Sequence, residues 1–195
     1  MSAFDAAKAA RGNPRGVLTD QEQDILRAAL VMACAGLDAA LKQAIRDSLS
    51  SLLEKQDKVR EGFEKFLRRR IEGVSEGVPV TLRGQFLATV LAAKDPRARM
   101  IEEYIKQLTG DSLQSWEELA SASAALGLDA IKMGLDKSRL VEVFRIRNKV
   151  IHELDMDLSA KARKRKVRGQ ADLLDNADLL LRSTGTVLEH LDKLM

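Results

Sequence analysis

A stripe of leucines, with one isoleucine, is the feature of this sequence that most restricts its fold. Its members recur at steps of three, four or seven residues: Leu26, Leu30, Leu37, Leu41, Ile45, Leu49 and Leu52. Just before it, Thr19-Asp20-Gln21-Glu22 forms a capping box, in which Thr19 accepts from an early helical N–H and Glu22 reaches back. Because this spacing places every member on one helix face, it predicts one long helix from about residue 20 to 54.

Shorter periodic stretches predict further helices, and no stretch alternates as a strand would. The predicted helices cover residues 59–73, 82–93, 96–110 and 137–154, with a weaker helix or turn at 112–126. Asp95 and Asp136 stand where N-caps are expected, and Pro96 suits the first helical position. The chain is therefore expected to be all-α.

The last predicted helix, residues 170–194, repeats apolar or small side chains every three or four positions. They are Leu173, Ala177, Leu180, Thr184, Val187, Leu191 and Leu194. Such a heptad-like stripe needs a facing helix, which we expect inside the domain in preference to a partner chain. The sequence thus predicts a helical bundle with short inserted helices, as one domain at 18–195 after a flexible tail at 1–17.

Composition excludes several classes of protein. The 195 residues carry 32 basic and 29 acidic side chains, so any affinity for nucleic acid must come from local clusters. No apolar run reaches the ~18 residues of a membrane span, and no apolar segment near residue 1 indicates a secretory signal. A single cysteine, Cys34, suits a reducing cytoplasm, where we expect the protein. Cys34 with two histidines cannot build a zinc finger, and no glycine-rich phosphate loop is present, so no metal or cofactor is predicted.

The segment from Leu140 to Asp155 holds the candidate chemistry. On a helix, Arg147 projects from the middle of an apolar face. A guanidinium there implies a carboxylate partner in the core, a side chain extended to the edge, or a cleft that binds an anion. Asn148 and His152 are four residues apart and share the flank of the helix with Arg145, seven before His152.

Arginine, asparagine and histidine together suit metal-free cleavage of an RNA phosphodiester. Histidine takes the 2′-OH proton or protonates the leaving oxygen, and arginine stabilises the charge that develops on the phosphorus centre. Asparagine orients the histidine or the phosphate. The residues alone leave this interpretation open against a simpler one, in which His152 is an ordinary surface residue and Arg147 extends to solvent.

The pattern Arg147-Asn148-x-x-x-His152 resembles the R-[polar]-x-x-x-H motif of the HEPN superfamily. The context is similar too, because an apolar helical turn precedes the motif, the motif comes late in an all-α chain, and a final helix follows it. The layout from about residue 20 to 195 is most similar to the RiboL-PSP-HEPN branch, which occurs among prokaryotic defence and RNA-processing systems.

The resemblance implies a metal-independent endoribonuclease that leaves 2′,3′-cyclic phosphate and 5′-OH ends. It implies a homodimer whose motif helices meet at a cleft, in a toxin–antitoxin or antiviral setting, with an antitoxin or regulatory protein as a further partner. Arg147 would hold the scissile phosphate, Asn148 would be the polar motif residue and His152 the general acid or base. Arg145 also stands within the tolerated spacing and is an auxiliary candidate. Some toxins of the family carry a tyrosine two residues after the histidine, and their antitoxin modifies it. Leu154 stands at that position here, which argues against regulation by such a modification.

A basic segment follows the motif helix and is a candidate RNA contact. Its cations are Lys161, Arg163, Lys164, Arg165, Lys166 and Arg168. They indicate either a patch that binds phosphates or an ordinary solvated surface. Glu142 and Glu153 either orient the motif side chains or are plain surface carboxylates. The alternative function is a non-catalytic helical module that binds RNA or protein, or a regulatory subunit of another enzyme.

Overall fold

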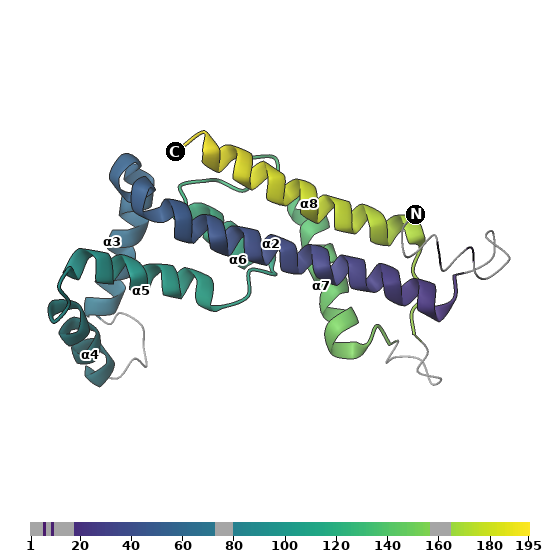
Figure 1. The fold of residues 1–195 in the computed structure, drawn as a ribbon, viewed down its shortest axis with the longest axis horizontal. Coiled ribbons are helices and arrows are strands. Elements are labelled where there is room, and N and C mark those ends of the chain that lie inside the picture. Colours follow the sequence, from purple (N-terminus) through teal and green to yellow (C-terminus); the bar gives the residue numbers. More distant parts are fainter. Residues whose placement is uncertain (1–5, 7–8, 10–17, 73–79, 157–164) are drawn as a thin grey trace.

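A single 36-residue helix, α2 (Asp20–Lys55), runs along the molecule and contacts α3, α5, α7 and α8 (Figure 1). The computed structural model describes residues 6, 9, 18–72, 80–156 and 165–195, and in these it contains seven α-helices and no strand. The other helices are α3 (Asp57–Glu72), α4 (Val80–Leu91), α5 (Pro96–Gly110), α6 (Trp116–Ala125), α7 (Lys137–Glu153) and α8 (Gln170–Asp192). The predicted all-α fold is confirmed.

The start of α2 is fixed by the predicted capping box. Thr19 Oγ1 accepts from the Glu22 backbone N–H at 3.3 Å, and the Thr19 N–H donates to Glu22 Oε2 at 2.7 Å. Asp95 and Asp136 likewise cap α5 and α7. These contacts span only three residues, which is why the sequence predicts them correctly. The tail at 1–17 lies outside the described residues, apart from residues 6 and 9.

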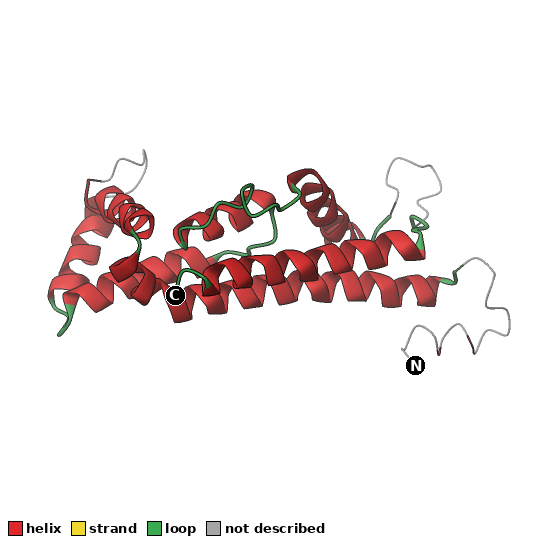
Figure 2. Cartoon of the chain, turned by 90° about the horizontal axis from the view of Figure 1, so that it is seen from above, coloured by secondary structure: helices red, strands yellow, loops and turns green. Residues whose placement is uncertain are grey.

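The helix that faces α8 is α2, so the predicted intramolecular partner is confirmed. The two helices lie side by side in both views (Figures 1 and 2). The stripe of α2 is fully buried, and it meets the buried side chains of α8, which are Leu173, Leu180, Ser183, Val187 and Leu191. Two stripes that repeat every three or four residues therefore close over each other and form the long axis of the core.

Most of the shorter helices gather on one side of the α2–α8 pair (Figure 2). Helix α6 contacts both α3 and α7, and it places Trp116 and Leu119 in the core. Trp116 belongs to the core, since it is only 6% exposed. Helix α7 packs against α2, α6 and α8, and this packing fixes the direction in which the motif side chains point.

Neighbouring leucines of α8 should differ sharply in their contribution to stability. Leu180 is fully buried against α2, whereas Leu181 is 59% exposed. We expect Leu180→Ala to lower the free energy of unfolding by about 3 kcal/mol. Leu181→Ala should change it by no more than about 0.5 kcal/mol. Urea unfolding followed by circular dichroism measures both. Equal losses would mean that Leu181 is also covered in solution.

Candidate functional site

The flank of α7 forms one wall of a groove of about 370 Å³, and the start of α6 forms the other. We call it the α7 groove. Its polar lining is Ser115, Glu117, Arg145, Asn148, Lys149, His152 and Glu153, and its apolar lining is Trp116, Val141 and Phe144. A groove of this size accommodates one small ligand, and its charged lining consists of two cations, Arg145 and Lys149, and two carboxylates, Glu117 and Glu153.

Three of the four predicted motif residues meet in this groove. Arg145, Asn148 and His152 all line it, as their spacing of three, four and seven residues along one helix predicts. His152 is exposed and stands in the last turn of α7. Lys149, which sequence reasoning did not select, adds a second cation beside Arg145. It stands three residues before His152 on the same helix, and this spacing was the available signal.

Arg147 is not part of the groove lining. Its side chain is half-buried, and its Nη1 donates to Asn148 Oδ1 at 2.9 Å. Burial raises the pKa of the Cys34 thiol on α2 to about 11, and the positive charge of Arg147 opposes that rise. Its buried Nε has no hydrogen-bond partner among the described residues. Because Arg147 occupies the amide oxygen of Asn148, the amide N–H groups are what Asn148 offers to a bound anion.

Arg145 is held by a neighbour on its own helix. Its Nε and Nη2 donate to the two carboxylate oxygens of Glu142 at 2.7 and 2.6 Å. These hydrogen bonds lower the pKa of Glu142. Glu142 therefore orients Arg145, which is the first of the two interpretations that the sequence left open for this carboxylate. Both side chains are about half exposed, so the pair is weak and a phosphate can displace the carboxylate.

A buried carboxylate just after the motif was missed by sequence reasoning. Asp155 is 1% exposed and accepts from Arg27 Nε at 3.1 Å. It also accepts two hydrogen bonds from Arg168, from Nε at 2.7 Å and from Nη2 at 2.6 Å. Leu154 and Asp155 have φ values of 51° and 56°, so the chain turns sharply through left-handed backbone where α7 ends.

Arg27 joins this carboxylate to α2 and to the residues before α8. It is 3% exposed and donates also to Gln23 Oε1, to Asp24 Oδ1 and to the Lys166 carbonyl. All three nitrogens of the guanidinium thus donate hydrogen bonds, which compensates the cost of burying it. The available signal was its position seven residues before the buried Cys34, on the face of α2 that was expected to be apolar.

The described part of the basic segment is engaged within the fold. Arg165 pairs with Asp24 at 2.8 Å, and Arg168 with Asp155. The Lys166 backbone N–H donates to the Asp155 carbonyl at 2.9 Å. Three of the predicted RNA contacts, Lys161, Arg163 and Lys164, lie outside the described residues. Two of the six cations therefore have intramolecular partners, and they are poor candidates for phosphate contacts.

Comparisons with models of protein families, with curated proteins and with solved structures found no match to this chain. Within the described ranges, no group of three or more histidine, cysteine or acidic side chains is placed to hold a metal ion. No helix in that same part of the chain is both long and apolar enough to cross a membrane.

Removing the Asp155 charge should destabilise the protein in a pH-dependent way. Burial opposes ionisation of Asp155, but hydrogen bonds from Arg168 and Arg27 outweigh it, and the pKa falls below its usual value. The carboxylate therefore stabilises the fold above the unfolded pKa of about 3.9, and this contribution is lost as pH falls through the lower folded value. At pH 7 we expect Asp155→Asn to cost about 3 kcal/mol of unfolding free energy.

Urea unfolding of wild type and variant between pH 3 and pH 7 measures this difference. The difference in unfolding free energy between wild type and Asp155→Asn should become smaller toward pH 3, because the wild-type carboxylate gains a proton there. Asp192→Asn, at an exposed position on α8, is the matched control and should leave stability nearly unchanged. A gap that stays constant with pH would show that Asp155 is not ionised in the folded protein.

Proposed function

We propose that the α7 groove is the active site of a metal-independent endoribonuclease, as the resemblance to the HEPN superfamily implies. One observation supports this most directly: His152, Asn148 and two cations line a single groove of the size of a nucleotide. The products would be a 2′,3′-cyclic phosphate and a 5′-OH.

The chemistry requires one proton to be removed and another supplied. His152 takes the proton of the ribose 2′-OH, and that oxygen attacks the adjacent phosphorus. The bond from phosphorus to the 5′ oxygen of the next nucleotide breaks, and this oxygen takes up a proton as it leaves. In a homodimer whose motif helices face each other, the second copy of His152 supplies that proton. The charge on the phosphoryl oxygens is stabilised by cations in the groove.

We assign the phosphate contact to Arg145 and Lys149, and a positioning role to Arg147. Arg145 lines the groove, where a phosphate competes with Glu142 for its guanidinium. Arg147 lies behind Asn148 and holds its amide oxygen. This assignment reverses the roles that the motif alone suggests for the two arginines, and it leaves Asn148 and His152 as proposed from the sequence.

Cleavage should depend on one of the two histidines. In excess EDTA, wild type should cut end-labelled RNA, and His152→Ala should be at least about 100-fold slower because it lacks a general acid or base. His190→Ala is the matched control, since His190 lies on α8 and contacts the Thr186 carbonyl. Gel analysis with end-group chemistry identifies cyclic phosphate. Equal cleavage by wild type and His152→Ala would contradict the proposal.

The two arginines should differ in the same assay. Arg145→Ala should slow cleavage about 100-fold, because it removes a charge that stabilises the transition state. If Arg147 acts through Asn148, then Arg147→Ala combined with Asn148→Ala should be no slower than Asn148→Ala alone. A multiplicative loss in the double variant would assign Arg147 an independent contact with the substrate.

A second candidate function, a helical module that binds protein, is favoured by the exposed face of α8. Leu174, Leu181 and Leu188 are spaced seven residues apart and are each at least 39% exposed. Such a ridge suits a helix of a second copy or of a regulatory protein, including an antitoxin. Absence of cleavage by wild type, together with association that Leu181→Asp abolishes, would favour this function over the nuclease.

A further inference from the structure

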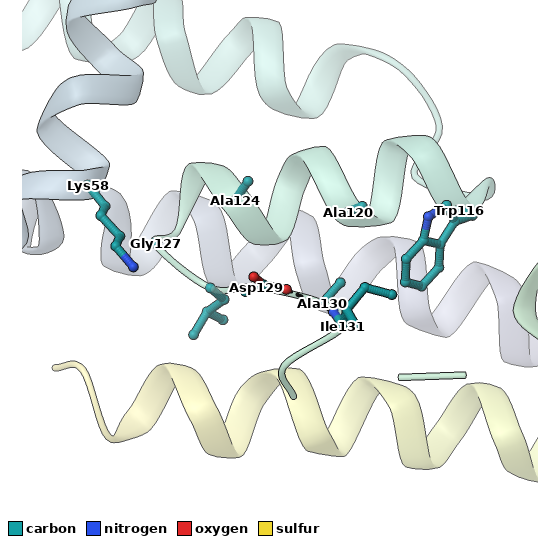
Figure 3. A pocket seen from close by; sticks show the side chains of 9 residues that line it. Lys58, Trp116, Ala120, Ala124, Gly127, Asp129, Ala130 and Ile131 are labelled. Carbon is teal, nitrogen blue, oxygen red and sulfur yellow. Dashed lines mark hydrogen bonds between the residues drawn. The ribbon is translucent and has the colours of Figure 1, made fainter. Parts of the chain in front are cut away.

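A second pocket, of about 410 Å³, lies next to the α7 groove (Figure 3). We call it the Trp116 pocket. Small side chains on one face of α6 and in the segment after it give it depth: Ala120, Ala124, Gly127 and Ala130. In Figure 3 the indole of Trp116 stands at one end, and the Lys58 side chain extends along the other.

Trp116 lines both the pocket and the α7 groove, so the two spaces are neighbours that share this side chain as a wall. The Lys137 ammonium lies 5.8 Å from the centre of that ring. Each space also has one exposed apolar side chain on its wall, Val141 in the groove and Ile131 in the pocket. Each of the two spaces that share Trp116 thus has an exposed apolar side chain, and the Lys137 ammonium lies over the indole ring.

Cations recur along this path. Arg145 and Lys149 lie in the groove, Lys137 lies at Trp116, and Lys58 lies at the far end of the pocket. Asp129 also lines the pocket, but its carboxylate accepts from the Ile131 and Lys132 N–H groups and lies 4.0 Å from the Lys132 ammonium, so it does not pair with Lys58. Apolar or aromatic surface that alternates with cations is what proteins use for single-stranded nucleic acid, because bases pack on the apolar parts and phosphates meet the cations.

We propose that the Trp116 pocket is a nucleobase subsite, which takes an unpaired base next to the nucleotide whose phosphate lies in the α7 groove. This proposal rests on the proposed nuclease function and specifies its substrate as single-stranded RNA. Helix α6 has ten residues and is about 15 Å long, so groove and pocket hold different nucleotides. A duplex cannot use the pocket, because its bases are already stacked on one another.

The positions of the cations favour a nucleobase over an apolar segment of a protein as the ligand of the Trp116 pocket. A peptide side chain would fill the small-residue wall equally well, but it would gain nothing from Lys58 at one end and Lys137 at the other. A nucleic-acid strand places a phosphate on each side of every base. Lys58 in the pocket and Lys149 in the groove thus offer contacts that a phosphate of a strand can use and an apolar peptide cannot.

Binding is tested apart from cleavage in the His152→Ala protein, in EDTA, with a fluorescein-labelled eight-nucleotide single-stranded RNA. Ala124→Phe fills the pocket from an exposed helical position and should weaken binding about tenfold, the value of one stacked base. Ser121→Phe, also exposed on α6 but outside the pocket lining, is the matched control and should bind as its parent does. Fluorescence anisotropy gives both affinities.

Two further readouts keep the test decisive if Ala124→Phe folds poorly. Lys58→Glu should weaken binding several-fold, whereas Lys106→Glu, at an exposed position on α5, should not. Trp116 is the only tryptophan, so its intrinsic fluorescence should be quenched by the RNA, and a pocket-filling variant should lose that quenching. Unchanged binding in both pocket variants, or equal affinity for a duplex, would overturn the proposal.

The outcomes separate this subsite from the nuclease function on which it rests. Cleavage by wild type that Ala124→Phe leaves unaltered would overturn the subsite and leave the active site in place. Binding that depends on the pocket, without cleavage by wild type on any RNA, would support the subsite and contradict the assignment of the α7 groove as a nuclease centre.

Discussion

The arrangement of the long helices depends on the ion pairs that the buried Asp155 carboxylate forms with Arg27 and Arg168. An isolated buried charge is too costly to persist, so each member of this group requires the others. Asp155 comes directly after α7, Arg27 belongs to α2, and Arg168 stands just before α8. The ends of three helices therefore meet at one charged cluster. His152, three residues before Asp155, is held in place by the same contacts.

The features that sequence predicted correctly are those set by neighbours within one or two helical turns. Thr19 caps α2 through Glu22, and Asp136 caps α7 through the Arg139 N–H, because both contacts close over three residues. The shared flank of Asn148 and His152 follows from the helical repeat in the same way. Even the pairing of α8 with α2 was accessible, since each carries a long apolar stripe that needs a partner.

Features that depend on distant residues or on competition between partners were not accessible. Arg27 and Asp155 are 128 residues apart, and nothing local marks either as a member of a buried pair. The helical repeat gives the angle at which Arg147 leaves α7 but not what it meets, so its contact with Asn148 was missed. The basic segment was counted as charge available to RNA, because a charge count does not reveal that Arg165 and Arg168 already bind Asp24 and Asp155.

The contacts around Asp155 also close a loop. Met156 and Arg165 form an isolated antiparallel bridge, and the Lys166 N–H binds the Asp155 carbonyl, so the chain is fastened on both sides of residues 157–164. The segment between these two points is thus joined to the bundle at both of its ends. Doubling its length would raise the closure free energy by only about 0.6 kcal/mol. A change in the length of chain between these two fixed points therefore costs little, as long as the contacts of Asp155 and Arg165 that fix its ends are kept.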